Sequence, residues 1–322
     1  MSSDSSLSLY STIQLRNGHK LPLLGLGTYT CTHDEARTSV STALSLGYRH
    51  IDTAEFYNNH EGIAQGIKDS GIARKDLFIT DKVSPGGNYS TKEKSYDEII
   101  DTCKAHLLRL KTEYIDLYLL HHAYAKSERI NQYKALLELQ RQGLVMEVGV
   151  SNWNVSHIEE IKSAGLPLPA VNQIEIHPLC TQEPLVSYLR DHDIVPIAYS
   201  SLAPSSHWRA LPGQRSAKPV ISTPNTDGTS CNSNSVSESL VECGRLVSEL
   251  TQKYGVSEAQ ILLRWAIQLG YPILTKSSKI ERIQANASIF HFSLSAEDIG
   301  RLSALDRNSP FAWPSGNPLH CE

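Results

Sequence analysis

The sequence of 322 residues predicts an α/β protein with the (β/α)₈, or TIM-barrel, architecture. Eight short apolar segments alternate along the chain with amphipathic helical segments, as in right-handed βαβ units with an all-parallel sheet. Eight such units in about 270 residues are what one barrel domain needs. Polar and ionisable side chains follow the ends of these segments, where parallel barrels carry their active sites.

The first element is a β-hairpin, with strands at 13–15 and 20–23 around an Asn17-Gly18 turn. Apolar runs then predict barrel strands at 23–27, 48–52, 77–81, 115–120, 145–150, 170–174, 194–198 and 271–274. Helical spacing of apolar residues predicts helices at 34–46, 59–69, 92–110, 129–142, 155–164, 183–192 and 279–289. We expect extra helices and a substrate loop toward the C-terminus.

Two segments break the alternation. Residues 202–236 are rich in Ser, Pro and Asn and predict a long loop, which in a compact domain is usually functional or disordered. The region after Asn308 is also irregular, and its Phe311 and Trp313 fold back either to line a pocket or to cover a barrel end. An open doubly wound sheet is the alternative fold, but Gly25-Leu26-Gly27 lacks the third glycine of a dinucleotide-binding turn.

The composition is that of a soluble globular protein, with 40% hydrophobic and 20% charged residues. A net charge of −4 gives no general attraction to nucleic acid or an anionic membrane, and no run of about 18 apolar residues is present. We therefore expect a small-molecule substrate, no nucleic-acid or membrane partner, and a monomer or a weak dimer.

The N-terminal residues 1–10 are Ser-rich and lack the basic and apolar regions of a secretory signal. They predict a flexible tail that precedes a single domain at 11–322. Six cysteines without CxxC spacing favour neither a zinc ribbon nor a disulfide framework. This usage indicates a reducing, cytoplasmic location.

Polar residues end most of the predicted strands, and the C-terminal ends of parallel barrel strands meet at one rim. The residues are Asp52, Lys82, His121, Ser151, Asn152, Gln173, Tyr199 and Lys276. Taken alone, Asp52 could cap a turn and the nearby Tyr57 could pack on the surface. The convergence of ionisable groups from several strands favours an active site instead.

The residue types suit proton transfer. A tyrosine needs a nearby cation to act as a general acid near neutral pH, because its ordinary pKa is near 10. We expect Lys82 to supply that cation and lower the pKa of Tyr57, Asp52 to hold Lys82, and His121 to donate a hydrogen bond. Imine formation at Lys82, as in barrel aldolases, is an alternative. A metal site at His121 and His122 is not expected, since adjacent strand residues point to opposite faces.

The sequence resembles the aldo-keto reductase superfamily along almost its whole length. The stretches that carry the resemblance are LRNGHKLPLLGLGTY, GYRHIDTAEFYNNHEGIAQGI, ITDK, EYIDLYLLHH, VGVSNW, VNQIEIHP, IAYSSL and TKSSKIERIQAN. The TDKVSP stretch is similar to a fungal branch with conjugated polyketone and α-keto amide reductases. The resemblance implies a barrel that binds NADP(H) along its C-terminal rim.

The resemblance also implies roles for single residues. Tyr57 is expected to donate the proton, with Lys82, Asp52 and His121 as its catalytic partners. The residues expected to bind the cofactor are Gly27, Thr28, Asp52, Ser151, Asn152, Gln173, Tyr199, Ser200, Ser201, Leu202, Lys276, Ser277, Ser278, Arg282 and Asn286. Lys276, Ser277, Ser278 and Arg282 correspond to the 2′-phosphate site, although residues 276–278 are also typical of an ordinary helix N-cap.

Departures from the family pattern concern the pocket. Ala285 replaces a glutamate that contacts the adenine in many members. Tyr29, Ser84 and His122 stand where members often have tryptophans, so a more polar or roomier substrate pocket is expected, with Trp313 as a further wall.

These residues predict NADPH-dependent reduction of aldehydes or ketones to alcohols. The alternative from another class is a catalytically silent nicotinamide-binding regulatory protein. We expect part of 202–236 to close over the bound cofactor.

Overall fold

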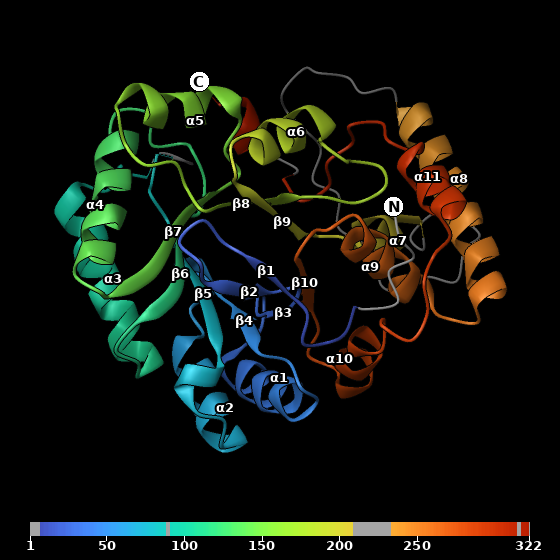
Figure 1. The fold of residues 1–322 in the computed structure, drawn as a ribbon, viewed down its shortest axis with the longest axis horizontal. Coiled ribbons are helices and arrows are strands. Elements are labelled where there is room, and N and C mark those ends of the chain that lie inside the picture. The colour runs from blue at the N-terminus through green and yellow to red at the C-terminus, as the bar shows by residue number, and fades with distance from the viewer. Residues whose placement is uncertain (1–6, 88–90, 209–232, 314–316, 322) are drawn as a thin grey trace.

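The computed structural model describes residues 7–87, 91–208, 233–313 and 317–321. In these residues, parallel strands close into a barrel in the order β10-β3-β4-β5-β6-β7-β8-β9 (Figure 1). The strands are β3 Leu24–Gly27, β4 His50–Asp52, β5 Phe78–Val83, β6 Ile115–Leu120, β7 Val145–Ser151, β8 Val171–Glu175, β9 Val195–Tyr199 and β10 Ile273–Lys276. The predicted (β/α)₈ barrel is confirmed, and the open doubly wound sheet is excluded.

Helices surround the barrel and connect its strands (Figure 1). They are α1 His33–Ser45, α2 His60–Ser70, α3 Tyr96–Leu110, α4 Arg129–Arg141, α5 Val155–Ser163, α6 Glu183–Asp191, α7 Ala203–Trp208, α8 Ser233–Tyr254, α9 Glu258–Gln268, α10 Ile280–Ala287 and α11 Ala296–Ser303. Capping boxes at Thr32, Ser95 and Ser257 satisfy the first backbone N–H groups of α1, α3 and α9. Across the described part of the chain, no helix combines the length and apolar character that crossing a membrane requires.

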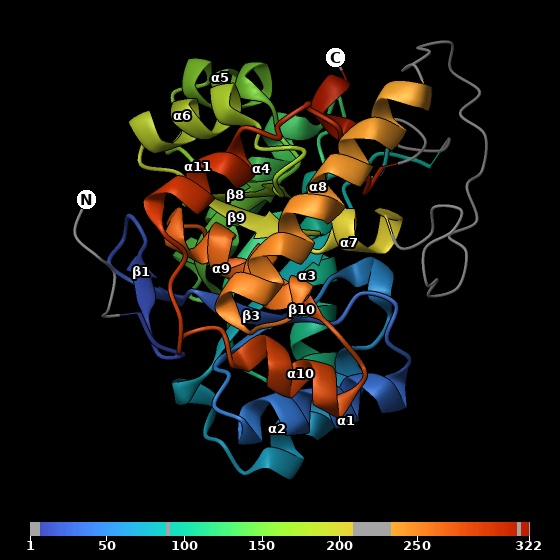
Figure 2. The ribbon, with the colours of Figure 1, turned by 90° about the vertical axis from the view of Figure 1, so that its right-hand side faces the viewer.

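The predicted hairpin forms from β1 Thr12–Gln14 and β2 Lys20–Pro22 and closes one end of the barrel. Its Leu15 and Leu21 pack with Leu117 and Leu119 of β6 in an inner core. Figure 2 shows the hairpin on one side of the barrel and α7 on the other. The open rim therefore lies opposite the hairpin, at the carboxyl ends of the strands.

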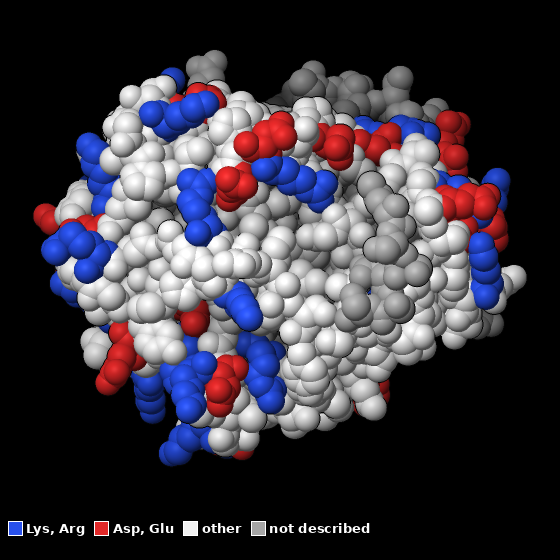
Figure 3. Space-filling view, in the orientation of Figure 1, with Lys and Arg blue, Asp and Glu red and all other residues white. Residues whose placement is uncertain are grey.

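Side chains alternate along each strand between this inner core and an outer layer beneath the helices. On β6, Tyr118 and Leu120 belong to the outer core, whereas Leu117 and Leu119 face inward. On the hairpin-bearing face in Figure 3, basic and acidic side chains are interspersed rather than gathered into one basic patch.

Several predicted boundaries were wrong. Strand β5 continues to Val83, so Lys82 lies inside the strand rather than after it. The predicted loop at 202–236 contains α7 and the start of α8, while 209–232 lie outside the described residues. Apolar residues from Leu240 to Leu250 are buried at helical spacing and form the core-facing side of α8. The sequence before them is Ser-rich, so its composition did not predict that the helix begins there. Of the predicted tail, residues 1–6 are not described, and Leu7 and Leu9 pack against the core.

Candidate active site

A buried ion pair joins two neighbouring strands at the open rim. The Lys82 Nζ donates to Asp52 Oδ1 at 2.6 Å and to the Thr53 carbonyl at 2.9 Å. The other Asp52 oxygen accepts from Gln173 Nε2 at 2.9 Å, across the barrel from β8. Burial raises the pKa of Asp52, and the Lys82 charge opposes that shift. The pair therefore holds a fixed ammonium group inside the barrel mouth.

Tyr57 lies above this pair at the end of a short 3₁₀ turn, η1 Glu55–Tyr57. The turn ends at Asn58, which adopts the left-handed conformation with φ of 50°. The Lys82 Nζ lies 5.2 Å from the centroid of the Tyr57 ring. The rings of Tyr29 and His121 approach that ring with centroid distances of 5.1 and 5.9 Å. The four predicted catalytic residues thus come together from β4, η1, β5 and the end of β6.

The electrostatics of Tyr57 differ from our expectation that Lys82 lowers its pKa. Burial, followed by the negative charge of Asp52, holds the pKa of Tyr57 well above its ordinary value. Burial is the larger cause of the difference. The direct bond between Lys82 and Asp52 adds to it, because the carboxylate offsets the ammonium charge that Tyr57 would experience. Tyr57 is therefore a protonated phenol at neutral pH, as a proton donor must be.

His121 follows β6 directly and is half-buried beside Tyr57. Burial and the Lys82 charge hold the pKa of His121 well below its usual range. Its imidazole is therefore neutral at physiological pH, with one N–H donor and one acceptor. It can donate a hydrogen bond to an oxygen without carrying a competing charge.

A chain of hydrogen bonds connects His121 to the opposite side of the rim. Asn152, with φ of 59°, donates from Nδ2 to the His121 carbonyl at 3.1 Å and to Ser151 Oγ at 3.0 Å. The Tyr199 hydroxyl donates to Asn152 Oδ1 at 2.6 Å and accepts from Trp313 Nε1 at 2.8 Å. Ser151 Oγ donates to the Gln173 carbonyl at 2.8 Å. The predicted cofactor residues at the ends of β7, β8 and β9 therefore form one connected group.

The C-terminal segment reaches this group through a carboxylate that the sequence had not singled out. Glu175 Oε1 accepts from the Phe311 N–H at 2.7 Å and Glu175 Oε2 from the Ala312 N–H at 3.0 Å. The Phe311 ring stacks on His177, with centroids 5.2 Å apart. These contacts bring Trp313 to the rim, 6.5 Å from His122 between ring centroids.

The predicted phosphate residues lie at the β10–α10 corner. Lys276, which ends β10 and pairs in register with Gly27, and Arg282 are exposed, whereas Asn286 is buried on α10. Ser277 Oγ accepts from the Lys279 N–H at 3.1 Å, which is the local turn that the N-cap alternative predicts. Near Tyr199, the buried Ser201 Oγ has no hydrogen-bond partner among the described residues.

The remaining predicted residues line the same region. Thr28 Oγ1 donates to the Asp52 carbonyl at 3.0 Å, and Ser200 adopts a positive φ of 54° just before Ser201. Tyr29 is exposed, and the Ser84 N–H donates to Glu55 Oε2 at 2.8 Å. Ser278 and Leu202 are half-buried beside the phosphate residues and Ser201, respectively. Burial lowers the pKa of His122 to about 3.

Two groups of polar residues went unnoticed in the sequence. Glu55 accepts from Lys94 Nζ at 2.6 Å beside Ser84. His60, Asp81 and His106 form a buried cluster behind β5. No motif spacing links the members of either group, so only the folded chain could reveal them.

Comparisons with known proteins agree on one family. A model of the Aldo/keto reductase family matches residues 23–307. A glyoxal reductase of Bacillus subtilis is 35% identical over 302 residues, which is 94% of this chain and 95% of that protein. A methylglyoxal reductase of Escherichia coli is 30% identical over 298 residues, 92% of this chain and 94% of that protein. A Bombyx mori aldo-keto reductase, solved in complex with NADP, has a TM-score of 0.75 and 29% identity and covers 94% of this chain and 95% of its own.

Proposed function

Because this chain belongs to the aldo/keto reductase family, we propose that it reduces aldehydes or ketones to alcohols with NADPH. The observation that carries the proposal is the buried Lys82–Asp52 pair beneath a protonated Tyr57 and beside a neutral His121. The glyoxal and methylglyoxal reductases among its relatives support small dicarbonyls as first substrates to test.

The residues of the rim fit NADP(H). Ser151, Asn152 and Gln173 offer amide and hydroxyl groups to a carboxamide, and the Tyr199 ring offers an aromatic face. The unpartnered Ser201 Oγ is available to a pyrophosphate oxygen, and the exposed Lys276 and Arg282 suit a 2′-phosphate. When bound, the nicotinamide would supply a hydride to the carbonyl carbon.

The chain's own residues would handle the proton. His121 donates a hydrogen bond that orients the carbonyl oxygen, and Tyr57 transfers its phenolic proton to that oxygen as the C–H bond forms. The phenolate that remains on Tyr57 is stabilised by the Lys82 ammonium, 5.2 Å from its ring. Asp52 keeps Lys82 in place through its 2.6 Å bond.

The test is Tyr57→Phe, which removes the proton donor and keeps the ring. We expect kcat to fall by at least about 100-fold, the contribution typical of a general acid, with NADPH affinity retained. NADPH oxidation with a panel of carbonyl compounds measures the rate, and fluorescence titration measures binding. Tyr10→Phe, which alters an exposed tyrosine on the barrel's outer surface, is the matched control and should keep full activity. Wild-type turnover in Tyr57→Phe would refute the mechanism.

Two other functions predict different experimental results. A catalytically silent nicotinamide-binding protein would bind NADPH but would not oxidise it with any carbonyl compound in the panel. A lyase acting through an imine at Lys82 would be trapped by borohydride in the presence of substrate. The ion pair between Lys82 Nζ and the Asp52 carboxylate disfavours the lyase, because it engages the nitrogen that would have to attack the carbonyl carbon.

A further inference from the structure

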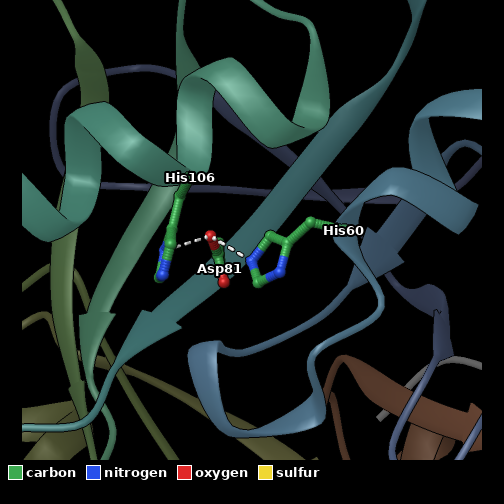
Figure 4. Close-up of side chains that lie close together, drawn as sticks. All are labelled: His60, Asp81 and His106. Atoms are coloured by element: carbon green, nitrogen blue, oxygen red, sulfur yellow. Dashed lines mark hydrogen bonds and ion pairs between the residues drawn. The ribbon is translucent and has the colours of Figure 1, made fainter.

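Three polar side chains are buried together on the outer side of β5. His60 Nε2 lies 3.0 Å from Asp81 Oδ2, and His106 Nδ1 lies 2.8 Å from the same oxygen. Figure 4 shows the two imidazoles, one from α2 and one from α3, approaching the carboxylate of β5 from two sides. The side chains of His60 and Asp81 have no exposed area, and that of His106 has 3%. The cluster therefore joins two helices to one strand, away from solvent.

Asp81 uses both of its oxygens as acceptors. Oδ2 serves the two imidazoles, and Oδ1 accepts from the backbone N–H of Lys82 at 2.8 Å. Burial opposes the ionisation of Asp81, but the charges and hydrogen bonds of His106 and His60 outweigh it and hold its carboxyl pKa below its usual range. Because an ionised carboxylate only accepts, both histidines must donate to it.

The cluster lies directly behind the proton-transfer group. Asp81 precedes Lys82 on β5, and alternation along the strand places the two side chains on opposite faces. His60 is the first residue of α2, which begins soon after the turn that carries Tyr57. The outer wall thus connects the segment bearing Tyr57 with the strand bearing Lys82.

A second contact from α3 acts on the same turn. Arg109, one helical turn after His106, donates from its guanidinium to Asn58 Oδ1 at 2.7 Å. It also donates to both carboxylate oxygens of Glu61, at 2.7 and 2.9 Å. Asn58 follows Tyr57 directly. Helix α3 therefore contacts this region on the buried side, through His106 and the Asp81 cluster, and on the exposed side, through Arg109 and Asn58.

We propose that His60, Asp81, His106 and Arg109 are positioning residues that hold the Tyr57 turn against the strand bearing Lys82. They touch neither substrate nor cofactor and act through the separation of Tyr57 and Lys82. This inference rests on the proposed function. Displacement of a reacting group by about 1 Å can cost about 100-fold in rate, so contacts that fix this separation control kcat. We call these four residues and their contacts the brace.

A divalent metal ion is the other possible occupant of such a cluster, since two imidazoles and a carboxylate can coordinate zinc. The observed 2.8 and 3.0 Å contacts already satisfy the carboxylate as hydrogen bonds. In addition, His60 Nδ1 has no partner among the described residues, whereas metal-bound histidines almost always donate their second ring N–H. The observations therefore favour a hydrogen-bonded positioning cluster over a metal site.

The test compares His60→Leu with His60→Gln. Leucine removes the donor to Asp81, whereas the glutamine amide can reach the position of Nε2 and keep it. For His60→Leu we expect kcat to fall about 10-fold, NADPH affinity to stay unchanged, and the solvent deuterium isotope effect on kcat to rise because proton transfer becomes slower. For His60→Gln we expect all three values to stay close to those of the wild type.

His157→Leu is the matched control, because it removes another buried histidine from the first turn of a helix, α5. It should lower the melting temperature and leave kcat and the isotope effect unchanged. If His60→Leu does not fold, Arg109→Ala provides the same readouts from the exposed contact. The expected fall in kcat is about two- to threefold, the size of effect that the loss of one surface ion pair produces.

The outcomes are distinct. A wild-type protein that reduces no carbonyl refutes the proposed function itself. An active wild type, with kcat and isotope effect unchanged in His60→Leu, or in Arg109→Ala if that variant replaces it, overturns the brace alone. A fall in wild-type melting temperature on EDTA treatment that added zinc reverses would also overturn it, in favour of a metal site.

Discussion

The β4–β5 corner and the β10–α10 corner of the same rim are built in opposite ways. At the first, Lys82 and Asp52 are buried and bonded to each other at 2.6 Å before any ligand arrives. At the second, Lys276 and Arg282 are exposed to solvent. The difference fits the two roles proposed for these corners. Proton transfer needs fixed groups in a low dielectric, whereas a solvated phosphate is captured by accessible cations.

Removal of Lys82 should have the largest effect, because it changes both chemistry and stability. In Lys82→Met, Asp52 loses its ion pair while buried, which we expect to cost about 3–5 kcal/mol in the free energy of unfolding. The phenolate of Tyr57 loses its cation as well, so kcat should fall by about 100-fold or more. Urea denaturation and NADPH oxidation assays measure the two effects.

Lys253→Met is the control for this prediction. Lys253 also donates to an aspartate, Asp298, at 2.7 Å, but on the outer helices α8 and α11. It should cost some stability and leave kcat unchanged. A Lys82→Met protein with normal kcat would remove the distinction between the two corners.

Removal of the exposed cations should affect binding alone. In the double variant Lys276→Ala with Arg282→Ala, we expect NADPH affinity to fall about 10- to 100-fold, since a hydrogen bond to a charged group contributes about 1.5–3 kcal/mol. NADH affinity and the melting temperature should hardly change, because NADH lacks the 2′-phosphate and the side chains are exposed. Fluorescence titrations with both cofactors provide the measurement.

Lys104→Ala, an exposed lysine on α3, controls for a general change in surface charge and should alter neither titration. Equal losses of NADPH and NADH affinity in the double variant would contradict the 2′-phosphate assignment. In that case residues 276–278 would be only the turn before α10, as the Ser277 hydrogen bond to Lys279 already allows.

The two corners also differ in what their sequences could predict. Asp52, His121 and Lys276 were placed correctly at the rim, because parallel strand ends converge whatever their exact boundaries. The direction of the Tyr57 pKa shift was wrong, because it depends on burial and on how far Asp52 neutralises Lys82. Such distances come from tertiary packing rather than from residue order.

The His60–Asp81–His106 cluster shows the same limit more strongly. Its members come from α2, β5 and α3 and share no motif spacing. From the sequence, Asp81 was predicted only to end a strand next to Lys82. His106 was predicted only to lie in the long amphipathic helix at 92–110. Only the closed barrel brings both histidines to one carboxylate oxygen. Sequence patterns therefore predicted the residues of the rim but not the buried cluster behind it.

A smaller effect is expected for the C-terminal segment, whose described residues reach the rim near β9 rather than at either corner. In Trp313→Phe, the ring is kept but the 2.8 Å hydrogen bond to the Tyr199 hydroxyl is lost. One such bond contributes about 0.5–1.5 kcal/mol, so KM for the carbonyl should rise about two- to tenfold with little change in kcat.

Trp265→Phe is the matched control. The buried Trp265 indole donates to Ser303 Oγ at 3.0 Å between α9 and α11, so its replacement should affect stability alone. An unchanged KM in Trp313→Phe would mean that the C-terminal segment covers a barrel end without lining the pocket, and the rim would then be formed by the strands and their loops alone.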